Sequence, residues 1–210
     1  MSLYTPTHFA RTEHAAIARV MREHPFATVV TPTDDEPAIS HLPLLHVPEG
    51  GEHGTLLGHF ARANSHWQLA RVRETIAVFH GPHAYISPMW YLAPAKSVPT
   101  WNYAAVHAHG VLAIDDTPEF ARQVLDALAQ HFEQGRPAPW NMGMMGERER
   151  SAMIGGIVAF RMPIARLETK FKLSQNRVPE DRTRVIAALA ADAHPDSVAT
   201  AGWMQQYSTP

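Results

Sequence analysis

The chain has 210 residues, of which 45% are hydrophobic and 18% charged, and its formal net charge is −2 at pH 7. This composition predicts a folded protein with a sizeable core and excludes a disordered chain, and the charge balance gives no global positive field for nucleic acid or membranes. Cysteine is absent, which excludes disulfides, thiolate metal sites and cysteine nucleophiles.

The first half of the chain is predicted to be mainly β, because ten of the seventeen prolines lie before residue 100 and forbid long helices there. A short amphipathic helix follows Thr12. Alternating β-branched runs and Gly, Pro and Asp clusters then predict strands at 26–31, 38–47 and 55–60.

The middle of the chain is predicted to contain a helical segment over 64–73, capped by Asn64 or Ser65. Two strands at 75–81 and 84–88 are interrupted at Gly81-Pro82. A proline-rich loop leads from there into a long strand over 98–114.

The second half of the chain is predicted to be more helical. Residues 115–135 have a capping signal, an early proline and an apolar stripe, and they end at Gly135, which favours a helix. A shorter helix is expected at 147–156, two strands at 156–162 and 164–174, and a last helix at 180–191.

These elements predict a mainly β fold with peripheral helices, of the α+β class, built on a closed or half-closed antiparallel sheet, because closure removes sheet edges. We expect one domain over 1–178, with the C-terminal helix and tail of 179–210 packed on it.

Histidine clusters and serines are weak candidates for a metal or a hydrolytic site. His107 and His109 share a strand face, but no Asp or Glu occurs in the cluster, so no metal site is predicted. No Ser lies in a G-x-S-x-G turn, and the adjacent Ser40 and His41 point to opposite faces of a strand.

A flat cofactor that carries a phosphate accounts for more of the polar residues, because it needs cations, amide groups and aromatic walls. Arg62 and Asn64 stand at a predicted helix start, where an anion is favoured. The segment 174–177 and the lysines of a K-x-K add further donors. Other roles remain open alternatives for these residues. Arg62 can form a surface salt bridge, Asn64 can simply cap the helix, and the lysines can lie on a solvated strand face.

Five blocks of the sequence, in order, resemble the signature blocks of the PaiB-type family of FMN-binding split-barrel proteins, often labelled negative transcriptional regulators. They are "ISHLPLL", "GTLLGHFARANSHW", "HGPHAYISPMWY", "VPTWNYAAVHAHG" and "FKLSQNR", within a match from Met1 to about Arg177. The resemblance implies a six-stranded antiparallel split barrel of the pyridoxine-phosphate-oxidase-like type, and a homodimer that holds FMN at its interface.

The resemblance also implies a set of cofactor-binding residues. They are Ser40, His41, Arg62, Asn64, His66, Trp67, Trp101, Asn102, Tyr103, Lys172, Gln175 and Arg177. Packing of Trp101 and Tyr103 at a dimer contact without flavin is the alternative, since interfaces are rich in the same residues. No catalytic residue is assigned.

Three functions compete: a regulator that acts through flavin or protein contacts, an FMN-dependent oxidoreductase on a small substrate, and a haem-binding or haem-degrading protein. The only dense basic run, Arg182 to Arg184, lies beside Glu180 and Asp181, so direct binding of nucleic acid is not expected. The chain has neither a signal segment nor an apolar run of roughly 18 residues, so we expect a cytoplasmic protein that does not enter membranes.

Overall fold

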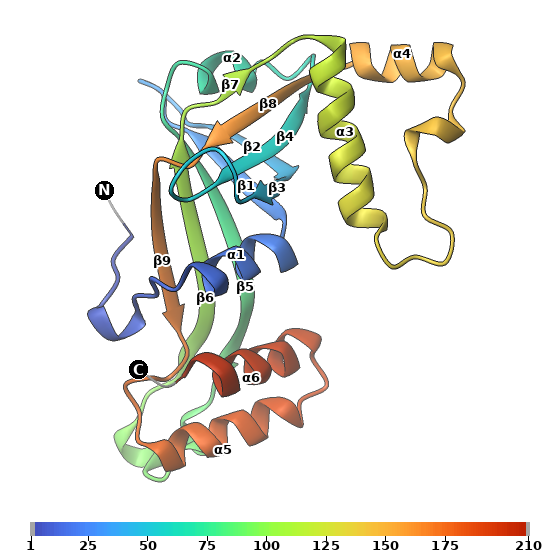
Figure 1. The fold of residues 1–210 in the computed structure, drawn as a ribbon. Coiled ribbons are helices and arrows are strands. Elements are labelled where there is room, and N and C mark those ends of the chain that lie inside the picture. Colours follow the sequence, from blue (N-terminus) through green and yellow to red (C-terminus); the bar gives the residue numbers. More distant parts are fainter. Residues whose placement is uncertain (1–2, 209–210) are drawn as a thin grey trace. The chain divides into compact units, whose positions relative to one another are not determined.

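The computed structural model describes residues 3–208 (Figure 1). Its helices are α1 (His14–Glu23), α2 (His66–Ala70), α3 (Pro118–Glu133), α4 (Glu147–Gly155), α5 (Pro179–Ala190) and α6 (Pro195–Tyr207). Its strands are β1 (Phe26–Thr31), β2 (Ala38–Pro43), β3 (Leu45–Val47), β4 (Thr55–Ala61), β5 (Thr75–Ile86), β6 (Thr100–Gly110), β7 (Ala113–Ile114), β8 (Ile157–Pro163) and β9 (Arg166–Lys172).

The strands form two sheets, with the orders β2-β1-β5-β6-β9 and β3-β4-β8-β7. The β1–β2, β1–β5, β3–β4, β4–β8 and β7–β8 pairs are antiparallel. The predicted mainly antiparallel fold with peripheral helices is therefore confirmed. The resemblance implies six strands, whereas the described residues form nine, among them the short strands β3 and β7 at the two edges of the β4–β8 ladder.

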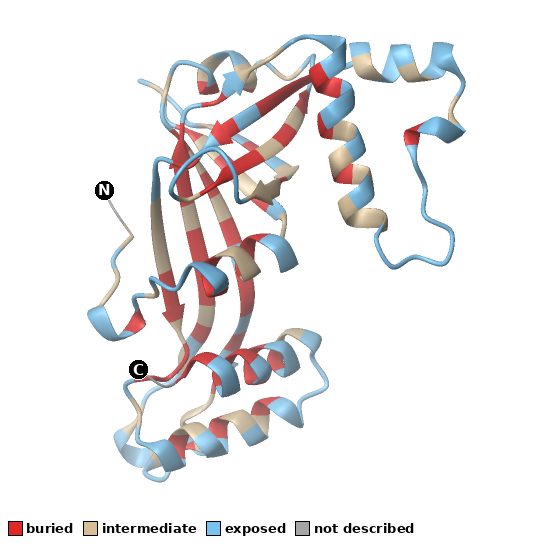
Figure 2. Cartoon of the chain, in the orientation of Figure 1, coloured by how far each residue is buried: buried red, intermediate tan, exposed pale blue. Residues whose placement is uncertain are grey.

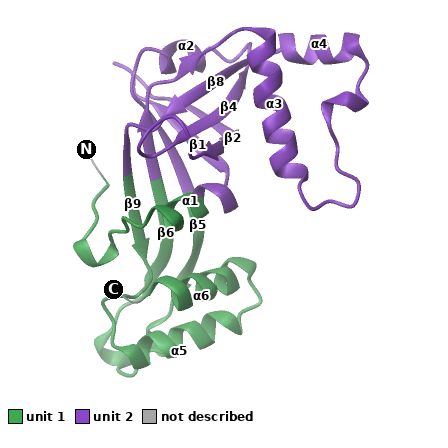
Figure 3. Cartoon of the chain, in the orientation of Figure 1, with its two compact units in different colours: residues 1–20, 80–106, 168–210 green, residues 21–79, 107–167 purple. Residues whose placement is uncertain are grey.

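The chain divides into two compact units (Figure 3). Unit 1 comprises residues 1–20, 80–106 and 168–210, and unit 2 comprises 21–79 and 107–167. Strands β5, β6 and β9 each contribute residues to both units.

The core of unit 1 contains an aromatic cluster that fixes α6. The ring of Phe171 on β9 lies 5.5 Å from that of Trp203 and 5.8 Å from that of Tyr207, measured between centroids. The guanidinium of Arg11 lies over Tyr207, and it also donates to the carbonyl of that residue at 2.7 Å. The C-terminal segment is thus part of the core of this unit.

The core of unit 2 confirms the apolar stripe expected for residues 115–135. Phe120, Val124 and Leu128 of α3 are buried together with Ala159 of β8. Thr117 caps this helix by accepting a hydrogen bond from the backbone N–H of Phe120. The following helix, α4, has no buried residue, as the tan and pale blue ribbon in Figure 2 shows.

Two strand boundaries differ from the sequence prediction. The interruption expected at Gly81-Pro82 is absent from the described strand, because β5 runs through both residues, and Gly81 packs closely on Ala104. The long strand expected over 98–114 ends at Gly110, where an added Cβ would lie 2.5 Å from the carbonyl oxygen of Pro163.

None of the helices within residues 3–208 is both long enough and apolar enough to cross a lipid bilayer.

Candidate functional site

A buried chain of hydrogen bonds in unit 2 joins several of the predicted cofactor residues; we call it the His66 network, and it consists of Thr31, Ser40, Asn64, His66 and Thr75. The Nδ1 of His66 lies 2.8 Å from the hydroxyl of Ser40, which accepts from the amide of Asn64 at 3.0 Å. The Nε2 of His66 lies 2.8 Å from the hydroxyl of Thr31, which in turn lies 2.6 Å from the hydroxyl of Thr75. The network ties the end of β1, the middle of β2 and the start of β5 to the start of α2.

The hydrogen-bond pattern favours one neutral form of His66. Because the amide of Asn64 donates to Ser40, the Ser40 hydroxyl is free to donate to Nδ1, and Nε2–H then donates to Thr31. The side chain is 4% exposed, and burial lowers the pKa of His66 below its usual value. Burial therefore favours the neutral ring, and all of these hydrogen bonds are satisfied when its proton is on Nε2.

Arg62, at the turn after β4, forms a clamp between three segments of unit 2. Its guanidinium donates to both carboxylate oxygens of Asp116, at 2.6 and 3.0 Å, and to the carbonyls of Gly155 and Ile157. Four of its five N–H groups are therefore used within the chain, and one remains. The carboxylate raises the pKa of Arg62.

Two further predicted residues flank this region. The indole N–H of Trp67 points back to the carbonyl of Arg62 at 3.4 Å. His41 follows Ser40 on β2 but has an exposed side chain, and its ring stacks on Phe26 and contacts the hydroxyl of Thr28 at 3.2 Å. Adjacent strand residues face opposite sides, so Ser40 joins the buried network and His41 does not.

A second group of polar and aromatic residues lies in unit 1; we call it the lysine cluster, and it consists of Thr100, Trp101, Tyr103, Lys170 and Lys172. The ammonium of Lys172 donates to the carbonyl of Trp101 and to the hydroxyl of Thr100, each at 2.5 Å. The ammonium of Lys170 donates to a backbone carbonyl at 2.8 Å and lies 5.7 Å from the ring centroid of Tyr103.

The charges of this cluster are not neutralised within the part of the chain that the structure describes, where neither ammonium takes part in an ion pair. Burial, followed by the positive charges of Lys170 and Arg177, lowers the pKa of Lys172. Lys170 is only 9% exposed. Buried cations without a counter-charge are unfavourable, so this arrangement suits an anionic ligand.

The remaining predicted residues of unit 1 lie in its interior or at the start of α5. Asn102 is buried and donates to the hydroxyl of Ser174 at 2.9 Å. The amide of Gln175 bonds to the backbone of Phe171 and Leu173. The guanidinium of Arg177 lies 4.2 Å from the ring centroid of Tyr91.

The structure thus groups the twelve predicted residues by unit. In unit 2, Ser40, Asn64 and His66 are joined directly. In unit 1, Lys172 and Trp101 are joined directly.

Other members of these groups were missed by the sequence analysis. Thr31 and Thr75 of the His66 network are distant in sequence from their partners and belong to no recognisable motif, and Asp116, the ion-pair partner of Arg62, lies only within the capping signal of 115–135. Lys170 was noted in the sequence as part of a K-x-K with Lys172, but it is not among the residues that the resemblance implies.

Each of the two groups has a feature relevant to ligand binding in its own unit. The lysine cluster places the ammonium of Lys170 near the ring of Tyr103 and that of Lys172 on the backbone carbonyl of Trp101, which suits a flat anionic molecule. The His66 network supports the turn after β4 that carries Arg62 and the start of α2, where Trp67 lies. The charge and the aromatic ring of the lysine cluster fit an anionic, flat ligand such as a flavin nucleotide.

Comparison with known proteins supports this interpretation. Residues 3–166 match the model of the family described as "Putative FMN-binding domain". The protein named "Protease synthase and sporulation protein PAI 2" of Bacillus subtilis is 33% identical over 204 residues, which cover 97% of each chain.

Two solved structures have a similar fold. The FAD and haem binding protein of Mycobacterium smegmatis has a TM-score of 0.59 at 15% identity, over 77% of this chain and 72% of that one. The flavocytochrome Anf3 of Azotobacter vinelandii also has a TM-score of 0.59, at 14% identity, over 83% and 75%. The predicted split-barrel fold class is confirmed, and the chain belongs to the "Putative FMN-binding domain" family, as its PaiB-type sequence blocks predict.

Proposed function

We propose that the protein binds FMN and acts as a PaiB-like regulator through flavin or protein contacts. The observation that carries the proposal is the lysine cluster, where Lys170 lies near the ring of Tyr103, Lys172 donates to the backbone carbonyl of Trp101, and neither has a carboxylate partner in the described chain. A family match over most of the chain supports flavin as the ligand of such a site. When bound, FMN would supply one- and two-electron transfer chemistry.

The residues proposed to hold the cofactor have different roles. Those of unit 2 are Ser40, His41, Arg62, Asn64, His66 and Trp67, and those of unit 1 are Trp101, Asn102, Tyr103, Lys172, Gln175 and Arg177. Side chains with free donors or exposed rings are proposed to contact FMN directly. Buried ones with satisfied hydrogen bonds, such as those of Ser40 and Gln175, are proposed to position the contacting residues.

We further propose a homodimer with FMN at its interface. Trp101 is 52% exposed and Tyr85 is 48% exposed, and the ring of His83 lies 5.6 Å from that of Trp101. Exposed clusters of aromatic rings are typical of interfaces. Light scattering on a sizing column is expected to give twice the chain mass; a monomer that binds FMN at full affinity would refute the interface site.

Regulation by direct DNA binding is not part of the proposal. In α5, Arg184 donates to the carbonyl of Trp90 and Arg182 to that of Arg177, so the basic run is engaged with its own unit. A recognition helix needs free cationic side chains that reach the groove. A salt-sensitive, sequence-specific complex with duplex DNA would contradict this part of the proposal.

FMN-dependent oxidation or reduction of a small substrate is the second candidate function, favoured by the same lysine cluster, since positive charge stabilises a reduced flavin. Both candidates require flavin binding. The test is a titration of the protein with FMN, monitored through the quenching of flavin fluorescence, which is expected to saturate. An unchanged fluorescence would reject both candidate functions.

A further inference from the structure

A cavity of about 740 Å³ lies in unit 2 beside the second half of α3. Its walls are formed by that half of the helix, by Leu45 of β3 and by the loop 134–141, and we call it the α3 cavity. Small-molecule sites have volumes of roughly 300–1,000 Å³, so the α3 cavity has the size of a ligand site. Among the described residues that line it, none belongs to the twelve predicted cofactor residues.

The loop that closes one side of the cavity is fixed at its turn and at its end. Gly135 has a φ of +81°, which favours glycine, and the chain turns there and runs back toward α4 (Figure 1). The backbone N–H of Trp140 donates to a carboxylate oxygen of Glu133 at 3.1 Å. Met142 is the only one of the described residues 134–156 that is buried. The α3 cavity is therefore part of the folded unit.

The charge of the walls selects the sign of a ligand. Among the described residues that line the cavity, none is a lysine or an arginine, whereas Asp126 and Glu133 are acids. The C-terminal end of α3 adds the partial negative charge of its last carbonyl groups. Arg122 and Arg136 pair with the two acids at 3.9 and 3.4 Å, but both arginines are more than half exposed and lie outside the walls. Because exposed ion pairs are weak, the cavity favours a cation.

The remaining walls offer an apolar surface with one aromatic ring. Leu45, Ala127 and Pro139 contribute aliphatic groups, and Trp140 is 39% exposed. The indole ring is the aromatic group that attracts a cation most strongly. Its position next to Glu133, with which its backbone is hydrogen-bonded, brings a carboxylate and an aromatic ring together. This combination suits an organic cation better than a bare metal ion.

We propose that the α3 cavity binds an organic ammonium ion that has an apolar body. The ammonium group lies near Glu133 and Trp140, and the apolar body lies against Leu45 and Pro139. The cavity is formed by residues of unit 2 alone, whereas the lysine cluster belongs to unit 1. The inference therefore goes beyond the proposed flavin function and does not require that FMN binds.

The test compares three probes that share one apolar body and differ in charge: phenylbutylamine, which is protonated at neutral pH, phenylbutanol and phenylbutyrate. Their dissociation constants for the full chain are measured by ligand-observed NMR. We expect the amine to bind about tenfold more tightly than the alcohol, and the alcohol to bind more tightly than the carboxylate. Equal affinities for the amine and the alcohol, or binding of none of the three probes, would overturn the proposal.

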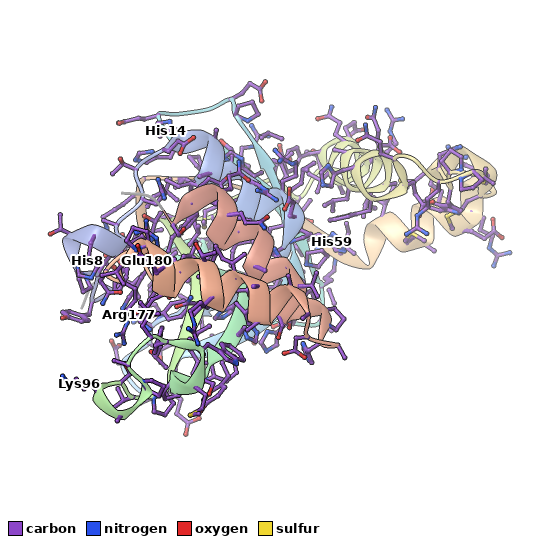
Figure 4. All side chains as sticks on the ribbon, turned by 90° about the horizontal axis from the view of Figure 1, so that it is seen from below. His8, His14, His59, Lys96, Arg177 and Glu180 are labelled. Atoms are coloured by element: carbon purple, nitrogen blue, oxygen red, sulfur yellow. The ribbon has the colours of Figure 1, made fainter. Side chains whose placement is uncertain are left out.

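Variants locate the bound amine. Glu133→Gln removes the charge but keeps an oxygen that can accept the hydrogen bond from Trp140, and we expect it to weaken binding of phenylbutylamine by about fivefold without changing that of phenylbutanol. Asp126→Asn, at an exposed side chain, is expected to act in the same direction. Glu180→Gln is the matched control, because Glu180 is exposed at the start of α5, in unit 1 (Figure 4). An amine affinity that is unchanged in both cavity variants, or equally reduced in Glu180→Gln, overturns the proposal.

Discussion

Replacing Ser40 with alanine tests whether the His66 network stabilises unit 2. The hydroxyl of Ser40 bridges the imidazole of His66 and the amide of Asn64 at 2.8 and 3.0 Å. Its loss leaves a nitrogen of a 4% exposed ring without a partner, which costs about 1–3 kcal/mol of unfolding free energy. For a chain of this length, roughly 2 kcal/mol corresponds to a decrease in melting temperature of roughly 4–8 °C.

The assay is urea and thermal unfolding followed by circular dichroism, with Ser65→Ala as the matched control. Ser65 is an exposed serine one position before His66, and its side chain forms no capping hydrogen bond. We expect the control to change the unfolding free energy by less than about 0.5 kcal/mol. Equal stability of Ser40→Ala and the wild type, or an equal loss in Ser65→Ala, would refute the argument.

Two further predictions concern acid and a close backbone contact. Burial lowers the pKa of His59 and of His66, so below about pH 6.5 the unfolded chain takes up protons that the folded chain does not. The unfolding free energy should therefore fall as the pH falls, by at most roughly 1.4 kcal/mol per pH unit for each histidine. Urea titrations at pH 5.5 and 7.5 that give equal stability would contradict this. Gly110→Ala places a Cβ 2.5 Å from a backbone oxygen and should lower the unfolding free energy by about 1–3 kcal/mol. Gly155→Ala is the control, because its added Cβ has no atom within 4 Å. Urea unfolding of this variant should give an unchanged or slightly higher stability.

Local pattern was sufficient to predict most of the elements. The helix α3 shows its apolar stripe and cap in sequence, whereas the alternation of lysines with Phe171 on β9 does not give alternating burial, because Lys170 is buried as well as Phe171. Helix α6 was not predicted as a separate helix, because its buried residues are spread around the helix instead of forming a narrow stripe, and they include Ser197, Thr200 and Trp203.

The candidate site was less predictable because its contacts are long-range. Ser40 and His66 could be named from the family blocks, but their direct hydrogen bond joins residues 26 positions apart. Arg62 and Asp116 are 54 positions apart, and nothing in one sequence indicates that they pair. Such pairs depend on the register of the sheet and on where α3 packs. Hydrophobic periodicity in the sequence gives information on neither.

The measurement that tests the central claim most directly is the visible absorption spectrum of the protein after incubation with FMN and removal of free cofactor on a desalting column. Our account predicts that flavin absorption bands remain with the protein at a fixed ratio to the chain. Absence of these bands would contradict it, and a retained Soret band after incubation with haem would then assign the fold to the haem-binding alternative.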